Sequence, residues 1–315
     1  MSVAKYKIFA GSSHPKLAME IAKHLKKPLG KISLSTFSCG EKYIVLEETV
    51  RGHTAFIVQT CTDQNVNEDY MELFLMCDAM KRSFASKVHV ILPYFGYSRQ
   101  DKVHIPREPI SAKVIADLLI AAGADHVVTL QLHADQEQAF FDVPVDNLSI
   151  KKLFAEYFKT KKLTNVVVVS PDAGGAKNAK GFADQLNAPF AIIHKARPSH
   201  NVSQITHVVG DVKDKTCIIY DDMVDTGGSV INAKTALLKA GAKKDVYLCA
   251  THPIFSGKAP TNLKKAKFKE VVVSNSMPIS AKKKFKGLKV ISVAPLLAGV
   301  IESVTHQKSV SSLVY

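Results

Sequence analysis

Short apolar runs alternate along the chain with segments in which apolar residues recur every three or four positions. Unbroken runs of β-branched residues, such as Val166–Val169, are typical of strands that are covered on both faces. The segment His14–Lys26 instead places Leu17, Ile21 and Leu25 on one helical face. This alternation of strands and helices predicts an α/β fold with mostly parallel sheets flanked by helices.

Strands and helices can be assigned by range from this pattern. The apolar runs predict strands at Tyr6–Ala10, Ala55–Gln59, Val88–Leu92, His126–Leu130, Asn165–Ser170, Phe190–His194, Thr216–Tyr220, Asp245–Ala250 and Glu270–Val273. The periodic segments predict helices at His14–Lys26, Met71–Ser83, Pro109–Ala122, Ala173–Leu186 and Ser229–Ala240. Ser13 is the expected N-cap of the first helix, and Gly123 and Gly241 are expected to end two of the others.

The length of the chain, 315 residues, suggests about two domains. A boundary is expected near residues 147–151, because the preceding segment FFDVPVDNLS has turn residues and no periodicity, and a new helix starts after it. We therefore expect one domain over residues 1–148 and a second over residues 149–291, with similar strand–helix alternation in each.

The strongest local signal for chemistry is the segment CIIYDDMVDTGGS at residues 217–229. It predicts a buried strand that ends in carboxylates, then a glycine turn and a helix. Backbone N–H groups and the helix dipole at such a junction suit a phosphate, and the carboxylates could accept hydrogen bonds from sugar hydroxyls. The same residues could instead form only a helix cap and a tight turn. The candidate residues are Asp221, Asp222, Asp225, Thr226, Gly227, Gly228 and Ser229.

Two further strand ends carry polar residues. Asp172 lies in SPDAGGAK after a buried strand, where it could bind a hydrated Mg²⁺ or only cap a helix. His133 lies in LHADQEQAFFD just past another strand. Because Mg²⁺ prefers oxygen ligands, His133 would contact a phosphate or a metal-bound water, although a lone histidine at this place is more often structural.

Two irregular stretches place cations in loops. The polar stretch at residues 94–109 is too long for a simple turn, and its Arg99 and Gln100 could bind the phosphates or the base of a nucleotide. Lys195 and Arg197 lie in KARPSHN after a strand and could clamp a transferring phosphoryl group. A solvated surface loop is the alternative for both stretches.

The charge composition argues against nucleic acid as a partner. The formal net charge is +14, from 42 basic and 28 acidic residues, and only five of the basic residues are arginines. Nucleic-acid readers favour the bidentate arginine fork, so the lysine excess, including the lysine-rich segment 258–289, is expected to be solvated surface. Neither a GxxxxGK[ST] nor a GxGxxG pattern is present, so ATP would be held by another route.

Cysteine usage and hydropathy indicate the compartment. Five cysteines without a CxxC pair argue against a disulfide framework and against a structural zinc site. No apolar run approaches the ~18 residues that span a bilayer, and the first residues lack the features of a signal peptide. We therefore expect a cytoplasmic protein with no membrane partner.

The motifs follow one another in an order that is similar to that of a single family over roughly residues 6 to 315. They include FSCGE, PYFGYSRQDK, AGADHVVTLQLHADQEQAFFDVPVDNL, VVSPDAGGAKNAKGFA and DDMVDTGGS. Together they closely resemble those of the ribose-phosphate pyrophosphokinases (phosphoribosyl pyrophosphate synthetases). The resemblance implies two phosphoribosyltransferase-type domains, with a C-terminal tail, about residues 292–315, that returns to the first domain.

The resemblance also implies a reaction. The diphosphoryl group of Mg-ATP would move to the anomeric hydroxyl of ribose 5-phosphate, giving phosphoribosyl pyrophosphate and AMP. Lys195 and Arg197 would be the catalytic cations, and the segment from Asp221 to Ser229 would bind ribose 5-phosphate. The metal–ATP contacts would be His133 and Asp172, and the ATP-binding residues would be Phe37, Cys39, Glu41, Arg99 and Gln100. The family is commonly a homohexamer that is regulated by phosphate and ADP.

Three departures from the family pattern leave an alternative open. Cys39 stands where relatives usually carry Asp or Asn, and Gln131 where an Asp commonly precedes the Leu-His pair. Ala196 stands where relatives often have Arg, which spares the two cations on either side of it. A non-catalytic regulatory relative is therefore the alternative to an active enzyme. A phosphoribosyltransferase that consumes the activated sugar would share the Asp-Asp turn but would not explain FSCGE.

Overall fold

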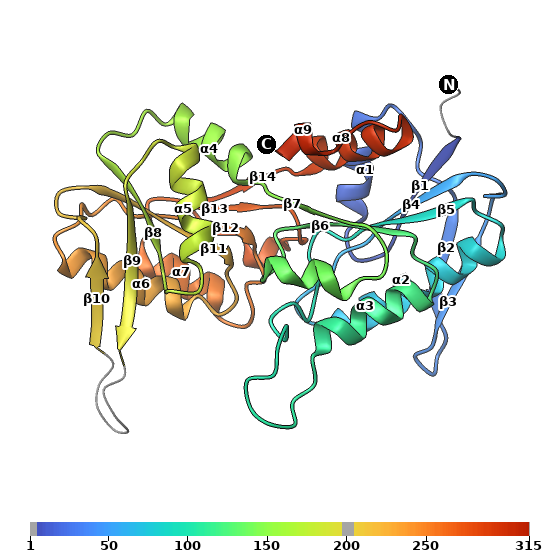
Figure 1. Cartoon of the computed structure of the whole chain (residues 1–315), viewed down its shortest axis with the longest axis horizontal. Helices are drawn as coiled ribbons and strands as arrows, with labels where there is room; N and C mark the ends of the chain where they lie inside the picture. Colours follow the sequence, from blue (N-terminus) through green and yellow to red (C-terminus); the bar gives the residue numbers. More distant parts are fainter. Residues whose placement is uncertain (1–4, 197–204, 315) are drawn as a thin grey trace. The chain divides into compact units, whose positions relative to one another are not determined.

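The computed structural model describes residues 5–196 and 205–314. The chain divides into two compact units. Unit 1 comprises Met1–Ser149, Ser276–Pro278 and Ser292–Tyr315, and unit 2 comprises Ile150–Asn275 and Ile279–Ile291. Each unit contains a central sheet with helices packed against it (Figure 1).

Unit 1 is built on a five-stranded parallel sheet with the order β1-β4-β5-β6-β7. Its strands are β1 (Tyr6–Ala10), β4 (Thr54–Val58), β5 (Lys87–Ile91), β6 (His126–Leu130) and β7 (Val145–Leu148). The helices are α1 (Pro15–His24), α2 (Val66–Arg82), α3 (Ser111–Ala121), α8 (Ala294–Thr305) and α9 (Ser311–Val314), with a 3₁₀ turn, η1 (Asp135–Phe140). A separate antiparallel hairpin joins β2 (Ile32–Thr36) to β3 (Lys42–Leu46).

The last long helix of the chain belongs to unit 1. Helix α8 packs against α1, and it buries Leu297, Val300 and Ile301. The hydroxyl of Ser292, just before α8, donates a 2.7 Å hydrogen bond to the carboxylate of Glu20 on α1. Residues far apart in the sequence therefore build one core.

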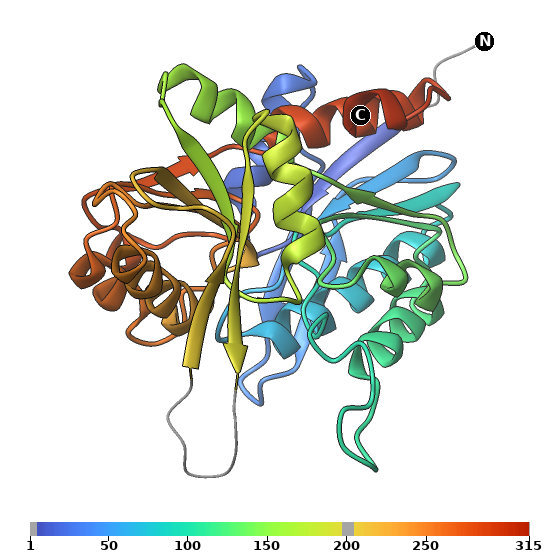
Figure 2. The ribbon, with the colours of Figure 1, turned by 60° about the vertical axis from the view of Figure 1, so that its left-hand side comes forward.

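Unit 2 is built on a seven-stranded sheet with the order β10-β9-β8-β11-β12-β13-β14. All neighbouring pairs are parallel except β9 and β10, which form a long antiparallel hairpin (Figure 2). The strands are β8 (Val166–Ser170), β9 (Phe190–Ala196), β10 (Ile205–Val209), β11 (Thr216–Met223), β12 (Tyr247–His252), β13 (Val271–Ser274) and β14 (Leu288–Ile291). The helices are α4 (Lys151–Thr160), α5 (Ala176–Gln185), α6 (Gly228–Lys239) and α7 (Ala259–Ala266), with a 3₁₀ turn, η2 (Ala281–Lys283).

Helices cover both faces of the unit 2 sheet, which explains the unbroken apolar strands. On one face Tyr220 of β11 stacks on Phe182 of α5, with ring centroids 4.6 Å apart. On the other face Ile219, the preceding residue, joins a core that includes Leu237 of α6 and Leu263 of α7. Successive side chains of β11 therefore enter opposite cores, so every position from Cys217 to Tyr220 is apolar.

The predicted α/β class with mostly parallel sheets is confirmed. Every predicted strand and helix is present, with ends displaced by a few residues. The pattern missed β2, β3, β7, β10 and β14, which are short or carry exposed polar residues. The prediction for the first helix cap was wrong: His14 is the N-cap of α1, and the Ser13 hydroxyl instead bonds to Gln59.

Candidate active site

The carboxyl end of β11 places Asp221 and Asp222 where the sequence predicted them. The Asp222 N–H donates a 3.0 Å hydrogen bond to Asp221 Oδ1. Loss of hydration raises the pKa of Asp221 well above its usual value, and the nearby charges of Asp222 and Asp172 raise it further. Three carboxylates therefore meet at one strand end, where a bound ligand that donates hydrogen bonds or carries positive charge would relieve their repulsion.

The turn after β11 leads directly into a helix N-terminus. Gly227 adopts a left-handed conformation with φ +81° and is the N-cap of α6, and its carbonyl accepts the Ile231 N–H at 3.1 Å. A residue outside the turn also holds its start, because Ser256 donates its N–H to the Asp225 carbonyl at 3.2 Å. The exposed Thr226, Gly228 and Ser229 thus lie at the positive end of α6, as an anion site requires.

Asp172 lies beside this strand end in unit 2. Its Oδ1 accepts the Gly175 N–H at 3.0 Å, and Ser170 donates its hydroxyl to the Asp172 carbonyl at 2.7 Å. A Cβ added to Gly175 would lie 3.7 Å from Asp221 Oδ1 and 3.8 Å from Asp172 Oδ1. The structure thus brings together two residues that the sequence assigned to different motifs.

The two predicted catalytic cations, Lys195 and Arg197, lie next to or within a part of the chain that the structure does not describe. Lys195 is the penultimate residue of β9 and pairs with Thr206 of β10, but its side chain lies outside the described part of the chain. Arg197 lies outside the described residues altogether. Their roles therefore stay predictions.

The three ATP-binding residues predicted in the FSCGE segment lie in one turn. Phe37, Cys39 and Glu41 lie between β2 and β3 and are exposed. Phe37 donates its N–H to the Glu41 carbonyl at 2.8 Å, and its ring lies 5.1 Å from that of Tyr43. Half of the Phe37 side chain's surface is accessible (51%), which leaves a ring face open for stacking.

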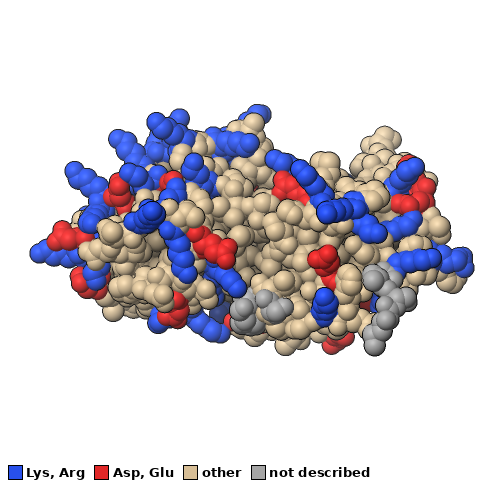
Figure 3. Space-filling model, turned by 90° about the horizontal axis from the view of Figure 1, so that it is seen from above, with Lys and Arg blue, Asp and Glu red and all other residues tan. Residues whose placement is uncertain are grey.

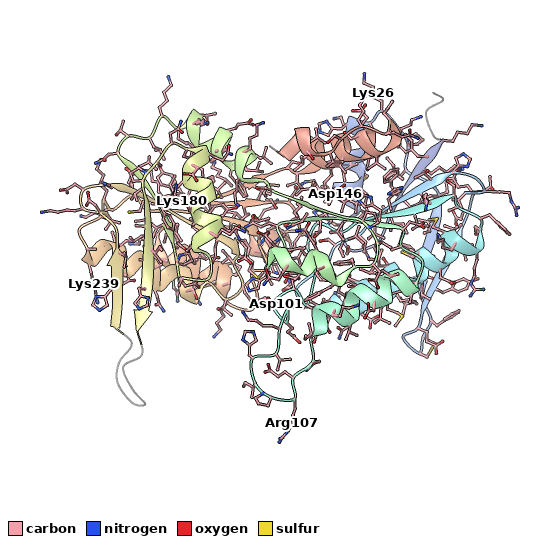
Figure 4. The ribbon with its side chains drawn as sticks, in the orientation of Figure 1. Lys26, Asp101, Arg107, Asp146, Lys180 and Lys239 are labelled. Carbon is pink, nitrogen blue, oxygen red and sulfur yellow. The ribbon has the colours of Figure 1, made fainter. Side chains whose placement is uncertain are left out.

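Arg99 and Gln100 lie at the start of the long loop after β5, and both are exposed. Figure 4 labels Asp101, which is buried at the base of this loop, and Arg107 at its far end. Gln100 is tied to the N-terminus of α3, because its side-chain oxygen accepts the Ser111 hydroxyl and its carbonyl accepts the Ala112 N–H at 3.3 Å.

His133 is exposed in the segment after β6, and its backbone is held to that same loop. Its N–H donates a 3.0 Å hydrogen bond to the Ser98 hydroxyl oxygen. Ser98 in turn donates to Glu137 Oε1 at 2.9 Å, and the Ala134 N–H donates to the same oxygen at 2.8 Å. Burial raises the pKa of Glu137 to about 7.

Sequence reasoning missed two buried carboxylates in unit 1. One is Glu137, which accepts the N–H of Ala134 three residues earlier; because that position is an alanine, the sequence shows no capping box. The other is Glu72 of α2, which accepts the Ser12 N–H at 2.6 Å and the Gln59 amide at 3.0 Å, and lies 3.4 Å from Lys42 Nζ. A buried glutamate within a helix gives no sequence signal that separates it from an exposed one.

The donor chemistry near Asp172 suits a hard cation that keeps its water. No group of three or more His, Cys, Asp or Glu side chains that could hold a metal occurs among residues 5–196 and 205–314. Carboxylate oxygens from Asp172 and Asp221 nevertheless lie close to Gly175. Because Mg²⁺ is usually held by one or two carboxylates together with waters and substrate phosphates, these residues fit Mg²⁺.

The surface agrees with the composition. On the face drawn in Figure 3, lysine and arginine side chains are spread out, with acidic side chains between them. Of the five cysteines, four are buried and Cys39 is exposed, and all are free. None of the helices in the described part of the chain is long and apolar enough to cross a membrane.

Comparison with known proteins links both units to one class. Residues 6–123 match the N-terminal domain of ribose phosphate pyrophosphokinase, and residues 198–315 match the phosphoribosyl synthetase-associated domain. The structure is similar to the crystal structure of phosphoribosylpyrophosphate synthetase from Mycobacterium smegmatis, with a TM-score of 0.91 and 44% identity, over 96% of this chain and 99% of that chain. The fold is therefore that of a phosphoribosylpyrophosphate synthetase.

Curated relatives give the family. The ribose-phosphate pyrophosphokinase of Clostridium perfringens is 48% identical over 311 residues, which are 98% of this chain and 97% of that protein. That of Bacillus caldolyticus is 48% identical over 307 residues, again 98% of this chain and 97% of the relative. The chain belongs to the ribose-phosphate pyrophosphokinase family, as its motifs predicted.

Proposed function

We propose that the protein transfers the diphosphoryl group of ATP to the anomeric hydroxyl of ribose 5-phosphate, giving phosphoribosyl pyrophosphate and AMP. The observation that carries this proposal is the junction of β11 and α6, where buried carboxylates, a left-handed Gly227 and a helix N-terminus follow one another in a chain of this family. A sugar phosphate needs that combination, because its hydroxyls donate hydrogen bonds and its phosphate is an anion.

In this proposal unit 2 binds ribose 5-phosphate. Asp221 and Asp222 accept hydrogen bonds from the ribose hydroxyls. The phosphate lies at the N-terminus of α6, where the backbone N–H groups of the segment from Asp225 to Ser229 and the Thr226 and Ser229 hydroxyls donate to it. Desolvated carboxylates favour a partner that donates hydrogen bonds, which supports this assignment.

Unit 1 binds ATP. Phe37 stacks on adenine, and Cys39 and Glu41 flank it in the same turn. Arg99 and Gln100 contact the nucleotide from the loop after β5, and His133 contacts the metal–phosphate end. Their exposure in the structure supports roles in ligand contact, because a buried side chain could not reach a nucleotide.

The chemical step is a displacement at the β-phosphorus. The anomeric oxygen forms a bond to that phosphorus and gives up its proton to solvent, and the bond from the phosphorus to the α-phosphate bridging oxygen breaks, so that AMP leaves. Lys195 and Arg197 neutralise the charge that develops on the transferring group.

Mg²⁺ is the cation that the family generally uses, and Asp172 would hold it in unit 2. When bound, it neutralises phosphate charge and polarises the phosphorus centre. The residues of this chain supply oxygen donors and orientation, and Asp172 is itself oriented by the Gly175 N–H.

The test is nucleotide product analysis. Purified protein is mixed with Mg²⁺, ATP, ribose 5-phosphate and inorganic phosphate, and the adenine nucleotides are separated over time. We expect AMP only when the sugar phosphate is present. Lys195→Ala should lower turnover by about 10²–10³-fold, because it removes a preorganised cation. ADP in place of AMP would contradict the mechanism, and near-normal turnover of Lys195→Ala would contradict the role of Lys195.

The same assay decides the alternative of a regulatory relative. The departures at Cys39, Gln131 and Ala196 favour that alternative, whereas the retained Lys195 and the β11–α6 junction favour the enzyme. A protein that makes no product alone, yet changes the turnover of a relative from the same family when mixed with it, would be the regulatory relative.

We also propose that the protein forms a homo-oligomer in the cytoplasm, a homohexamer as is common in the family, with phosphate and ADP as regulators. Exposed apolar side chains on α2 and α3, Met71, Val114 and Leu118, support self-association. Light scattering with and without phosphate tests the assembly, and phosphate and ADP titrations of AMP production test the regulation.

A further inference from the structure

A buried carboxylate joins two separate segments of unit 1. Glu137 in η1 is fully inaccessible (0%), and its Oε1 accepts both the Ser98 hydroxyl at 2.9 Å and the Ala134 N–H at 2.8 Å. Ser98, itself 3% accessible, also accepts the His133 N–H at 3.0 Å. The Ser98 hydroxyl thus donates to Glu137 and accepts from His133, two residues of the same segment after β6, so that its single proton is used in this network.

The two segments carry neighbouring ligand candidates. Ser98 immediately precedes Arg99 and Gln100 in the chain, and Ala134 immediately follows His133. The side chains of Arg99, Gln100 and His133 are exposed, whereas the groups that tie their backbones together are buried. A buried hydrogen-bond network of this kind fixes the backbone positions of the exposed side chains, and it leaves the space for the ligand free.

The carboxylate is a costly way to make these two bonds. Burial disfavours its charged form, and Oε2 has no hydrogen-bond partner in the part of the chain that the structure describes. An amide oxygen could accept the same two hydrogen bonds without a charge. The two accepted hydrogen bonds, rather than the charge, therefore hold the two segments in one arrangement.

We propose that Glu137 is a positioning residue for ATP: through Ser98 and Ala134 it holds the loop of Arg99 and Gln100 and the segment of His133 as one body. The inference rests on the proposed ATP-binding roles of these three residues. Without Glu137 the two segments move independently, and each ATP contact has to be ordered separately when the nucleotide binds. The ribose 5-phosphate residues lie in unit 2, so their affinity is not coupled to this network.

The experiment uses full-length Glu137→Leu, Glu137→Gln and Ser98→Ala. The dissociation constant of ATP is measured by calorimetry, and the KM values of ATP and ribose 5-phosphate by AMP production. We expect Glu137→Leu and Ser98→Ala each to weaken ATP binding about tenfold, because buried donors lose their acceptor, while the KM of ribose 5-phosphate changes less than about twofold. Glu137→Gln should restore most of the ATP affinity, since its oxygen accepts the same bonds.

A matched control separates positioning from loss of stability. Leu17→Ala removes a buried apolar side chain from α1 of the same unit, which packs against α8, β1 and β4; it should lower the melting temperature and leave the ATP dissociation constant unchanged. The double variant Ser98→Ala with Glu137→Leu should weaken ATP binding no more than either single variant, because both interrupt one network.

Two results would overturn the inference. One is an unchanged ATP dissociation constant in Glu137→Leu, or in Ser98→Ala if Glu137→Leu does not fold. The other is an equal rise in both KM values without rescue by Glu137→Gln. Wild-type protein that binds ATP but makes no AMP would overturn the proposed function instead, and the calorimetric comparison would still decide the role of Glu137.

Discussion

Asp221 shows how one residue can be unfavourable for folding and useful for binding. Its pKa is raised well above the usual value by burial and by the charges of Asp222 and Asp172, so the ionised form is destabilised in the folded protein. In the proposed function the carboxylate is retained because a sugar hydroxyl needs an acceptor. Active sites commonly hold such unfavourable groups.

Asp221→Asn is therefore expected to separate stability from affinity. The KM of ribose 5-phosphate should rise about tenfold, because a charged acceptor becomes a neutral one. The melting temperature should stay constant or rise, since repulsion among the three carboxylates decreases. Substrate titrations and thermal melts measure both. Asp184→Asn on the exposed surface of α5 is the control and should change neither; a lower melting temperature in Asp221→Asn would contradict the argument.

His89 predicts how stability depends on acid. The His89 ring stacks on Phe56 at 4.8 Å, and its Nδ1 lies 2.9 Å from Nδ1 of His126. Burial, together with the charge of the neighbouring His126 and against the opposing charges of Asp125 and Asp146, lowers the pKa of His89 to about 4. Because the unfolded state binds a proton at a higher pH than the folded state, stability is complete above about pH 6.5 and falls as the pH decreases toward 4.

His89→Gln should weaken this dependence. Urea unfolding at neutral pH and near pH 5 should show a smaller loss of stability in the variant than in the wild type, which should lose up to about 3 kcal/mol on approaching pH 4. His24→Gln, at an exposed position at the end of α1, should retain the wild-type dependence. Equal pH profiles in all three proteins would exclude His89 as the source.

Individual site residues could be predicted where they directly follow an apolar run that forms a strand. Asp221, Asp222 and Asp172 were found because polar residues directly follow apolar runs, and the structure confirms their places at strand ends. Glu137 and Glu72 were missed, because their importance comes from partners distant in the sequence, such as Ser98 and Ser12. Those partners become neighbours only when the sheet of unit 1 is assembled.

At the scale of elements, the turn between β11 and α6 depends on a single glycine. Gly227 has φ +81°, a conformation that costs an L-residue about 1–2 kcal/mol. Gly228, the next residue, has an ordinary φ, and a Cβ there would lie 3.9 Å from its nearest neighbour, Thr226 Oγ1. The backbone conformation therefore requires glycine at position 227 but not at position 228.

This difference gives a paired prediction. Gly227→Ala should lower the melting temperature by about 2–8 °C, because the strain is introduced in the folded state only. Gly228→Ala should leave the melting temperature unchanged or raise it, because alanine favours the first turn of α6. Differential scanning calorimetry of both variants measures the effect; an equal decrease in both would show that the left-handed turn is not the cause.

Elements were predictable in proportion to their burial. The runs that became β8 and β11 lie between two helical layers, so nearly every residue is apolar. Strand β7 was missed because it contains Asp146 and Asn147 and forms an edge of its sheet.

At the scale of the whole molecule, unit 1 is assembled from both ends of the chain. Deleting residues 292–315 should destabilise unit 1 selectively, because α8 buries Leu297, Val300 and Ile301 there, worth roughly 5–9 kcal/mol together. That is comparable with the whole stability of a domain. Hydrogen exchange should show loss of protection in α1 and β1, with β8 and β11 less affected.

The control deletion is residues 308–315, which leaves α8 in place. It should preserve the protection of α1. Uniform loss of protection in both units after the longer deletion would contradict the division into separately stabilised units.

The position of α8 has a consequence during synthesis on the ribosome. The residues from Ile150 to Ile291 are translated after the first part of unit 1 and before α8, which takes on the order of 10 s. During that interval the face of α1 that will receive α8 is bare, although its sheet has long left the ribosome. A nascent chain that stops before Ala294 would carry all the strands of both sheets yet present an apolar surface to chaperones and proteases. A nascent chain that has been translated through α8 can therefore cover this face of α1, whereas a shorter one cannot.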